Sequence, residues 1–358
     1  MMAPAAARLG LPLVLLADPD DPAALLVRDV IDGRPDAEGL RRLASRCDVL
    51  TVEHELVDVD TMEELAAEGH AVRPSAATLR VANDKIRQRE LLAAHGVPVA
   101  PWTVATDLAG VEAFAGEHGW PLVLKRPRGG YDGRGVWVVD DPSSAQAVVD
   151  EVAGEDLLVE PKLPIETELA VLVARRPGGE MAVYPAVETV QEDAMCREVV
   201  LPAPVSEQLT ARAESIGRRV AEAIGSVGML AVELFVVDGE VLLNELAARP
   251  HNAGHVTIEG SVTSQFENHL RAVADLPLGS TARRGPCAVM VNVVGEASDP
   301  RDRLAEALDV DDVAVHLYGK SFRPGRKLGH VTVTDADVDR ARARARLAAA
   351  RLVEGPPS

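Results

Sequence analysis

Two acidic residues, Glu233 and Glu245, stand in apolar segments on either side of the sequence Asp238-Gly239-Glu240. An Asp-Gly pair between apolar runs is typical of a β-hairpin. A three-residue loop would place the two carboxylates directly opposite each other, whereas a two-residue turn would place them on opposite faces. Facing carboxylates repel, and a divalent cation would reverse that interaction. We therefore expect the three-residue loop and a Mg²⁺–nucleotide site with Asn244 adjacent; the alternative is one ion-paired, buried Glu and one exposed Glu.

Four glycines occur within the seven residues 129–135, in a loop that we expect between two strands. Glycine lets backbone N–H groups curl around phosphate oxygens, and Lys125, at the end of the preceding predicted strand, would add positive charge. The segment fits neither a Walker loop, because Val136 follows it, nor the dinucleotide fingerprint. A tight hairpin and a surface lysine are the alternatives, but a hairpin needs one or two glycines rather than four. We therefore predict a flexible phosphate-binding lid.

Hydrogen-bonding side chains are concentrated in the seven residues that begin at Arg249, directly after the predicted hairpin. His251 and His255 have the spacing of two metal ligands on a helix, but Pro250 and Gly254 argue against a regular helix. We therefore expect an anion or carboxylate site that uses Arg249, rather than a zinc site. A structural turn with a buried salt bridge is the alternative.

A basic cluster is formed by Lys320, Arg323, Arg326 and Lys327, around Pro324-Gly325. In the chain as a whole, 56 acidic residues outnumber 37 basic ones, which gives a formal net charge of −19. That charge disfavours binding to nucleic acid or to an anionic membrane, but it permits a small anionic ligand where cations are concentrated. A solvated basic loop is the usual explanation of such a cluster. A phosphate clamp is the sharper hypothesis, and we favour it.

The elements that must position these residues follow from apolar periodicity. Apolar runs at 11–16 and 49–52 alternate with helix-like segments at 36–45 and 60–68, the βαβ rhythm of a parallel sheet. Further helices are predicted at 83–95, 107–118, 143–152, 209–224 and 338–353, and strands at 122–125, 136–139, 157–160, 168–174, 182–188, 230–237, 241–246, 288–294, 313–317 and 330–333. The fold class is therefore α/β (α+β), with the size of an enzyme.

Composition excludes several classes of protein. Aromatic residues make up 3% of the chain, too few for stacking platforms that bind single-stranded nucleic acid. The three cysteines, Cys47, Cys196 and Cys287, are far apart and form no disulfide framework or zinc spacing. No apolar run approaches the roughly 18 residues of a membrane span, and the apolar stretch 9–17 lacks a cleavage motif. We therefore expect a cytoplasmic protein that acts on small molecules, without nucleic-acid or membrane partners.

Taken together, these residues resemble the ATP-grasp superfamily, and more narrowly the 5-(carboxyamino)imidazole ribonucleotide synthetases of purine biosynthesis. The matching segments cover nearly the whole chain and are 129–135, 230–235, 244–247, 249–255, 263–267, 316–320 and 323–330. The last two distinguish this family from other ATP-grasp ligases. The resemblance implies an N-terminal βαβ substrate domain at 1–80, a two-lobed ATP-grasp domain at 81–275 (lobes at 97–163 and 164–275), and a small C-terminal domain at 276–358.

The resemblance also implies an activity and the residues that perform it. The enzyme would use MgATP and bicarbonate to carboxylate the exocyclic amine of 5-aminoimidazole ribonucleotide through carboxyphosphate, and it would be a homodimer. By matching position, the ATP site would contain Lys85, Lys125, Gly130, Tyr131, Asp132, Gly133, Arg134, Gly135, Val136, Glu160, Pro161, Lys162, Leu163, Glu168, Gln191, Asn244 and Glu245. The Mg²⁺ ligands would be Glu233 and Glu245. The catalytic residues facing bicarbonate and the amine would be Tyr131, Asp132, Arg134, Arg249, His251 and Asn252. The ribonucleotide phosphate would be bound by Lys320, Arg326 and Lys327, and the ribose or base by Glu55.

At four places the sequence departs from the pattern of that family. Lys85 stands where arginine is usual, Gln191 replaces a frequent histidine, and residues 53–56 read Glu-His-Glu-Leu instead of Glu-Phe-Glu-Asn. The fourth departure is at the start, where the family has a strand and a Gly-Gly-Gly-Gln-Leu loop. Here the chain opens on a helix-like segment at 1–9, so we expect the N-terminal domain to be truncated.

Two other functions are compatible with part of the pattern. Another ATP-grasp carboxylate–amine ligase, such as a formate-dependent transformylase, would release ADP with formate and glycinamide ribonucleotide, but it leaves the segment 320–330 unexplained. A non-catalytic ATP-binding relative finds support only in the absent N-terminal loop. The Glu233/Glu245 pair argues against the non-catalytic alternative.

Overall fold

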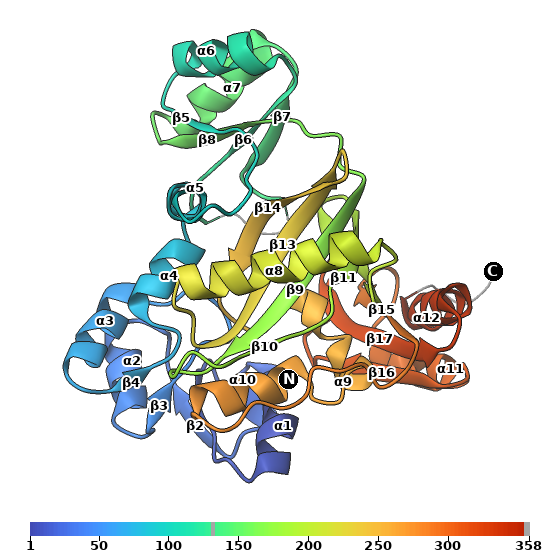
Figure 1. The fold of residues 1–358 in the computed structure, drawn as a ribbon. Helices are drawn as coiled ribbons and strands as arrows, with labels where there is room; N and C mark the ends of the chain where they lie inside the picture. Colours follow the sequence, from blue (N-terminus) through green and yellow to red (C-terminus); the bar gives the residue numbers. More distant parts are fainter. Residues whose placement is uncertain (130–132, 354–358) are drawn as a thin grey trace.

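The computed structural model of the chain describes residues 1–129 and 133–353. Figure 1 shows a four-stranded lobe at one end of the molecule, a large sheet in the middle and the N-terminal segment beside it. Within the described ranges, no helix is long and apolar enough to span a membrane.

The N-terminal segment contains short strands that pair in parallel, as the βαβ rhythm predicts. Its elements are α1 (Met2–Leu9), β1 (Val14–Ala17), β2 (Asp29–Asp32), α2 (Ala37–Ala44), β3 (Val49–Leu50), α3 (Val59–Ala67), β4 (Ala71–Val72) and α4 (Ala76–Ala82). Strand β1 pairs with β2, and β3 pairs with β4. The prediction of one parallel sheet is wrong in the described residues, because these pairs form two separate two-stranded sheets.

The four-stranded lobe is an antiparallel sheet in the order β5-β8-β6-β7. Its elements are β5 (Thr103–Ala105), α6 (Leu108–His118), β6 (Leu122–Lys125), β7 (Val136–Val139), α7 (Pro142–Val152) and β8 (Leu157–Pro161). Buried Val111 and Phe114 of α6 and Val148 of α7 pack with Leu122 and Leu124 of β6. Helix α5 (Lys85–Ala94) lies between this lobe and the rest of the molecule (Figure 1).

The central sheet has nine strands in the order β14-β13-β9-β11-β12-β15-β17-β16, with β10 paired to β9. Its elements are β9 (Thr167–Arg175), β10 (Met181–Val183), β11 (Val187–Glu192), β12 (Met195–Leu201), α8 (Glu207–Ala223), β13 (Gly228–Val237), β14 (Glu240–Ala247), α9 (Thr257–Gly260), α10 (Gln265–Val273), β15 (Cys287–Val294), α11 (Leu304–Leu308), β16 (Val313–Leu317), β17 (Lys327–Asp335) and α12 (Val338–Val353). The sheet runs continuously across residue 275, so the C-terminal strands extend the sheet that carries β9 and β13. The domain limits given above stay predictions.

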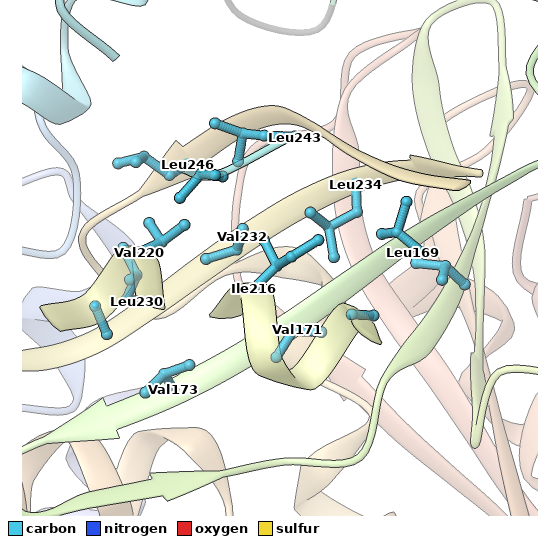
Figure 2. Close-up of a cluster of buried hydrophobic side chains, with 14 of the residues drawn as sticks. Leu169, Val171, Val173, Ile216, Val220, Leu230, Val232, Leu234, Leu243 and Leu246 are labelled. Carbon is cyan, nitrogen blue, oxygen red and sulfur yellow. The ribbon is translucent and has the colours of Figure 1, made fainter. Parts of the chain in front are cut away.

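The periodic stripe predicted for residues 209–224 lies on α8 and faces this sheet (Figure 2). Ile216 and Val220 pack against Val171, Leu230 and Val232 of β9 and β13, and all three strand residues are fully buried. Burying a Val, Leu or Ile side chain contributes about 1.5–3 kcal/mol. This layer therefore gives β13, which carries Glu233, a fixed backbone.

The predicted strand pattern lacks the short strands β2, β4 and β5, and it is wrong in two further places. The strand expected at 182–188 is two strands, β10 and β11, with Tyr184 buried between them. Strand β12 was not predicted, because polar Arg197 and Glu198 interrupt its apolar run. Glu198 is nevertheless buried, since Arg342 and Arg346 of α12 pair with its carboxylate.

Candidate active site

The hairpin of β13 and β14 brings Glu233 and Glu245 together by a different route from the one predicted. The connection is a two-residue turn at Asp238-Gly239, with φ values of 50° and 71°, so the prediction of a three-residue loop is wrong. A register shift between Glu233 and Leu234 compensates for the shorter turn, and Glu233 still pairs with Glu245. The extra residue on β14 is Asn244. A β-bulge of this kind re-aims side chains, and here it places both carboxylates on the same face.

The electrostatics of this carboxylate pair favour a bound cation. Burial, and then the nearby charges of Glu245 and Glu168, raise the pKa of Glu233 to about 8. Burial also opposes ionisation of Glu245, but Lys85, Lys125 and Arg89 together outweigh it and lower the pKa of this carboxyl. Lys85, at the start of α5, donates a hydrogen bond from Nζ to Oε2 of Glu245. The surroundings therefore oppose ionisation of Glu233 and favour ionisation of Glu245.

The donor set of the pair fits Mg²⁺. In residues 1–129 and 133–353, no group of three or more His, Cys, Asp and Glu side chains is arranged to hold a metal by itself. Mg²⁺ needs no such group, because it binds one or two carboxylates and completes its shell with water and substrate phosphates. Besides burial, repulsion from Glu245 and Glu168 raises the pKa of Glu233, and such a cation would relieve that repulsion.

A buried ion-pair network lies on the other side of Lys85. Lys125, the last residue of β6, lies 2.7 Å from Glu160 Oε2, and its Nζ is 3.5 Å from Asn244 Oδ1. Arg89 of α5 donates from Nε to Glu160 Oε1 at 2.7 Å. Burial opposes the charge of Glu160, but Lys125 and Arg89 outweigh it and lower the pKa of this carboxyl. The network fixes the Lys125 ammonium close to the hairpin.

Further predicted ATP-site residues line the strands around this network. Pro161 ends β8, and Lys162 follows with a backbone hydrogen bond to Pro121 O at 3.0 Å; Leu163 is the next residue. Glu168 lies on β9, and burial raises its pKa against a hydrogen bond from Gln191 of β11. The strand order places Glu168 and Glu233 on neighbouring strands.

The glycine-rich loop joins β6 to β7 as predicted, but Gly130, Tyr131 and Asp132 lie outside the described residues. Gly133 and Gly135 have φ values of 75° and 71°, in the left-handed region that favours glycine. A Cβ at Gly133 would lie 2.5 Å from the Cβ of Ala194, in the turn between β11 and β12. The loop therefore packs closely against the central sheet at this point. Arg134 and Val136 complete the described part of the predicted loop site.

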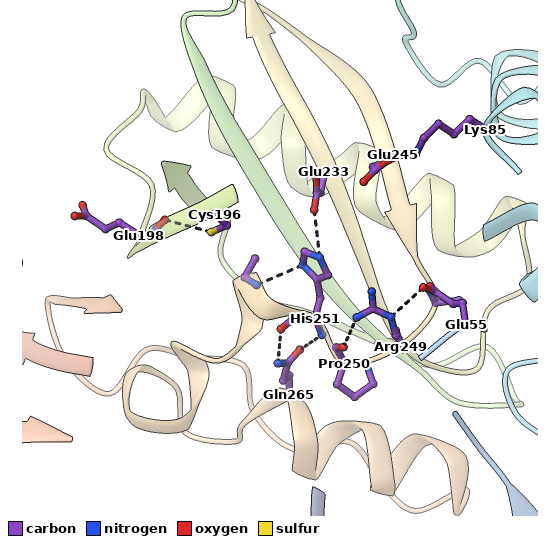
Figure 3. A network of polar contacts seen from close by, with 12 residues as sticks. Glu55, Lys85, Cys196, Glu198, Glu233, Glu245, Arg249, Pro250, His251 and Gln265 are labelled. Carbon is purple, nitrogen blue, oxygen red and sulfur yellow. Dashed lines mark hydrogen bonds and ion pairs between the residues drawn. The ribbon is translucent and has the colours of Figure 1, made fainter. Parts of the chain in front are cut away.

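Arg249, directly beyond β14, is oriented by Glu55 from the N-terminal segment. Its Nε donates to Glu55 Oε2 at 2.9 Å, and the N–H of Ala248 donates to Oε1 of the same carboxylate at 2.8 Å. Figure 3 shows this contact beside the Glu233/Glu245 pair. Glu55, expected to contact the ribose or base, thus also fixes the guanidinium that was expected to face bicarbonate.

His251 points at Glu233, with 3.2 Å between Nε2 and Oε1 (Figure 3). The N–H of Ala253 donates to Nδ1 of His251 at 3.3 Å, which assigns the ring proton to Nε2. Burial, and then the charges of Arg249 and Lys327, lower the pKa of His251 to about 3. His251 is therefore a neutral hydrogen-bond donor. The next residue, Asn252, begins a short 3₁₀ helix (Asn252–Gly254), so the expectation of an irregular backbone here is confirmed.

The basic cluster lies at the hairpin between β16 and β17. Lys320 follows β16, and Lys327 is the first residue of β17. Arg326 donates from Nη1 to the backbone oxygen and the hydroxyl of Ser321, at 3.1 and 2.8 Å. The charge of Lys327 contributes to lowering the pKa of His251, after burial and Arg249.

Two residues with a part in the site were not predicted. Gln265, fully buried at the start of α10, exchanges two hydrogen bonds with the backbone of His251, at 2.9 and 2.7 Å. Arg89 fixes Glu160, as described above. Gln265 lies in the segment 263–267, one of those that carry the family resemblance, and this was the only feature of the sequence that could have indicated its role. Neither residue stands in a local pattern that indicates chemistry.

Comparisons with known proteins agree with this geometry. Residues 90–266 match the model of the ATP-grasp domain, residues 288–344 the phosphoribosylaminoimidazole carboxylase C-terminal domain, and residues 1–83 the ribonucleotide synthetase preATP-grasp domain. The expected ATP-grasp architecture is thereby confirmed.

Individual relatives point the same way. N5-carboxyaminoimidazole ribonucleotide synthase of Mycobacterium tuberculosis is 44% identical over 352 residues, which cover 96% of this chain and 82% of that protein. The crystal structure of N5-carboxyaminoimidazole ribonucleotide synthetase from Thermus thermophilus superposes with a TM-score of 0.90 at 37% identity, over 100% of this chain and 96% of that chain. A structure of the Aspergillus clavatus synthase in complex with ADP and 5-aminoimidazole ribonucleotide has a TM-score of 0.90 at 31% identity, and the match covers 98% and 95% of the two chains.

Proposed function

The chain belongs to the N5-carboxyaminoimidazole ribonucleotide synthases, and we propose that it carboxylates 5-aminoimidazole ribonucleotide with ATP and bicarbonate by means of the residues described above. It is an ATP-dependent carbon–nitrogen ligase of purine biosynthesis. The observation that carries the assignment of residues is the convergence of two segments on the Glu233/Glu245 pair. Lys85 approaches from α5, and Arg249 and His251 approach from the segment after β14.

ATP would bind between the four-stranded lobe and the central sheet, with its phosphates near Lys85 and Lys125. The Lys125–Glu160–Arg89 network supports this placement, because it fixes an ammonium that a phosphate can approach. The glycine-rich loop would cover the phosphates and exclude water from the reactive intermediate. Glu233 and Glu245 would hold Mg²⁺, which supplies charge neutralisation on the phosphates.

The carboxylation would proceed in two displacements. An oxygen of bicarbonate attacks the γ-phosphorus of ATP, the bond to the β,γ-bridging oxygen breaks, and ADP leaves carboxyphosphate behind. The exocyclic amine then takes the carboxyl group, directly or as CO₂, and its proton passes to the departing phosphate. Arg249, fixed by Glu55, and the Nε2–H of His251 would stabilise the anionic oxygens, because both are donors already oriented before the reaction.

The ribonucleotide would bind between the N-terminal segment and the C-terminal hairpin. Its phosphate would lie at Lys320, Arg326 and Lys327, since cations concentrated in an acidic chain favour a phosphate there. Glu55, paired with Arg249, would meet the ribose or base.

The test is ADP release by the purified chain with MgATP and bicarbonate, with and without 5-aminoimidazole ribonucleotide. We expect release that depends on the ribonucleotide. ADP release only with formate and glycinamide ribonucleotide would indicate the transformylase instead. A chain that binds ATP without turnover under either condition would be a non-catalytic relative.

We also propose that the protein acts as a homodimer in the cytosol. The family resemblance supports the dimer, and the three free thiols of Cys47, Cys196 and Cys287 support a reducing compartment. Light scattering of the purified chain tests the dimer, and a monomer at micromolar concentration would contradict it.

A further inference from the structure

Tyr318 joins three elements in a cluster beside the proposed active site, and neither its ring nor its hydroxyl has a part in the function described so far. It follows the last residue of β16, and its N–H donates to Leu328 O at 2.9 Å. Its hydroxyl lies 3.0 Å from Nδ1 of His255 and 2.8 Å from Nδ1 of His330. His255 comes four residues after His251, and His330 lies on β17.

The Tyr318 hydroxyl is fixed both as a hydrogen-bond donor and as a hydrogen-bond acceptor. Burial lowers the pKa of His255 to about 3 and that of His330 well below its usual value, so both rings are neutral. A neutral imidazole has one N–H and one lone pair, and a phenol has one proton and two lone pairs. The Tyr318 hydroxyl therefore donates to one Nδ1 and accepts a hydrogen bond from the other.

Behind Tyr318, the second histidine is itself fixed. His330 is fully buried, and its ring stacks on that of His316 with 4.6 Å between centroids and 21° between planes. His316 Nε2 lies 2.8 Å from Oε1 of Glu259 in α9. This cluster therefore ties β16 and β17 to the segment that carries Asn252 and His255.

The other side of Tyr318 meets the proposed phosphate site. The Lys320 ammonium lies over the Tyr318 ring, 5.3 Å from its centroid, an arrangement that gives a cation–π attraction. Gly319 between them has a φ of 71°, and a Cβ there would lie 3.1 Å from Pro22 in the N-terminal segment. The chain thus turns tightly between the fixed tyrosine and the lysine.

We propose that Tyr318 is a positioning residue for the ribonucleotide phosphate: His255 and His330 fix its hydroxyl, and its ring sets the place of the Lys320 ammonium relative to the Arg249–Asn252 segment. The inference rests on the proposed function, because it takes Lys320 as a phosphate ligand. Tyr318 acts through Lys320 and need not touch the substrate itself.

Calorimetric binding of 5-aminoimidazole ribonucleotide without ATP tests this role independently of turnover. Tyr318→Phe removes the hydroxyl and keeps the ring, and we expect about tenfold weaker binding. The KM for ATP and the kcat at saturating ribonucleotide should stay within about twofold. Tyr184→Phe is the matched control, because the buried Tyr184 hydroxyl also makes two hydrogen bonds: it donates to Thr263 O at 2.9 Å and accepts from Asn268 Nδ2 at 2.8 Å. It should leave ribonucleotide binding unchanged.

A double-mutant cycle with Lys320→Ala separates positioning from general loss of structure. If Tyr318 acts through Lys320, adding Tyr318→Phe to Lys320→Ala should weaken binding by less than about twofold more. Full additivity, or a Tyr318→Phe protein that binds like wild type, would overturn the proposal. If Tyr318→Phe does not fold, His330→Gln replaces it in the test, because it removes one hydrogen-bond partner of the Tyr318 hydroxyl. The proposal then expects weaker binding of the ribonucleotide by His330→Gln, and wild-type binding would overturn it. Wild-type protein that binds the ribonucleotide but releases no ADP would overturn the proposed function alone, and wild-type protein that binds none would overturn both.

Discussion

The charged residues of this site form ion pairs with one another. Lys85 hydrogen-bonds Glu245, Arg249 is paired with Glu55, and Lys125 is paired with Glu160. Each of these cations is thereby oriented without substrate, which lowers the reorganisation that binding requires. Glu233 and Glu168 differ from these carboxylates: burial, and then the charges of neighbouring carboxylates, raise their pKa values.

The first prediction concerns the Glu233/Glu245 pair. Glu245→Gln should reduce ribonucleotide-dependent ADP release about a hundredfold or more, because it removes both a proposed Mg²⁺ ligand and the partner of Lys85. Glu240→Gln, at the exposed turn of the same hairpin, is the control and should stay within about twofold of wild type. Circular dichroism should show both variants folded. Normal turnover of folded Glu245→Gln would refute the metal assignment.

Among the structural elements, short irregularities matter more than the regular parts. The hairpin of β13 and β14 has a two-residue turn, which would separate Glu233 and Glu245 if the register were uniform. The bulge at Asn244 restores their pairing. The glycine loop likewise depends on one place, Gly133, where the backbone passes Ala194 too closely for a side chain.

A second prediction compares two glycines of that loop. Gly133 and Gly129 both have a φ of 75°, but the structure places no atom within 4 Å of a Cβ at Gly129 among the described residues. Gly133→Ala should therefore lower kcat/KM for ATP by about tenfold or more, because it adds both a clash with Ala194 and a strained positive φ. Gly129→Ala adds only the strained φ and should have a smaller effect. Steady-state ADP release measures both. Equal effects would show that the contact with Ala194 has no role in the lid.

In the whole molecule, the N-terminal segment is docked on helix α10 by polar contacts between distant residues. Thr51 Oγ1 lies 2.8 Å from Nε2 of His269, and Arg73 donates to Val273 O at 2.6 Å. Met229 N–H donates to Nδ1 of His269 at 3.1 Å, so the ring proton lies on Nε2 and faces Thr51. Helix α1 adds an apolar contact with α10 through Ala5, Ala6 and Phe266. This docking brings Glu55 to Arg249.

A third prediction follows from the burial of His269, which lowers its pKa from 6.5 to about 4. Between these values the unfolded chain binds a proton that the folded chain does not, so the free energy of unfolding rises with pH across this window. His269→Gln should flatten this dependence by up to about 1.4 kcal/mol per pH unit, measured by urea unfolding from pH 4 to 7. Thr51→Val should lower stability at every pH and keep the slope. An unchanged slope in His269→Gln would contradict the assignment.

Local sequence patterns predict most of the helices and strands, and they indicate the kind of chemistry that the site residues could perform. Local periodicity and turn residues depend on neighbours in the chain, and helices such as α8 and α12 and strands such as β6, β7 and β16 lie where they were predicted. Glycines, paired carboxylates and clustered cations indicate phosphate chemistry by their types alone, and the family resemblance connected them.

The contacts between these residues depend on the folded chain as a whole. The register shift at Asn244, the burial of Glu198 in β12, the two separate N-terminal sheets and the extension of the central sheet by β15–β17 all depend on pairing with distant strands. The contacts of Tyr318 with His255 and of Arg249 with Glu55 join residues 63 and 194 positions apart. No local pattern carries such contacts, because their free energy arises from burial and hydrogen bonding that exist only once the whole chain has folded.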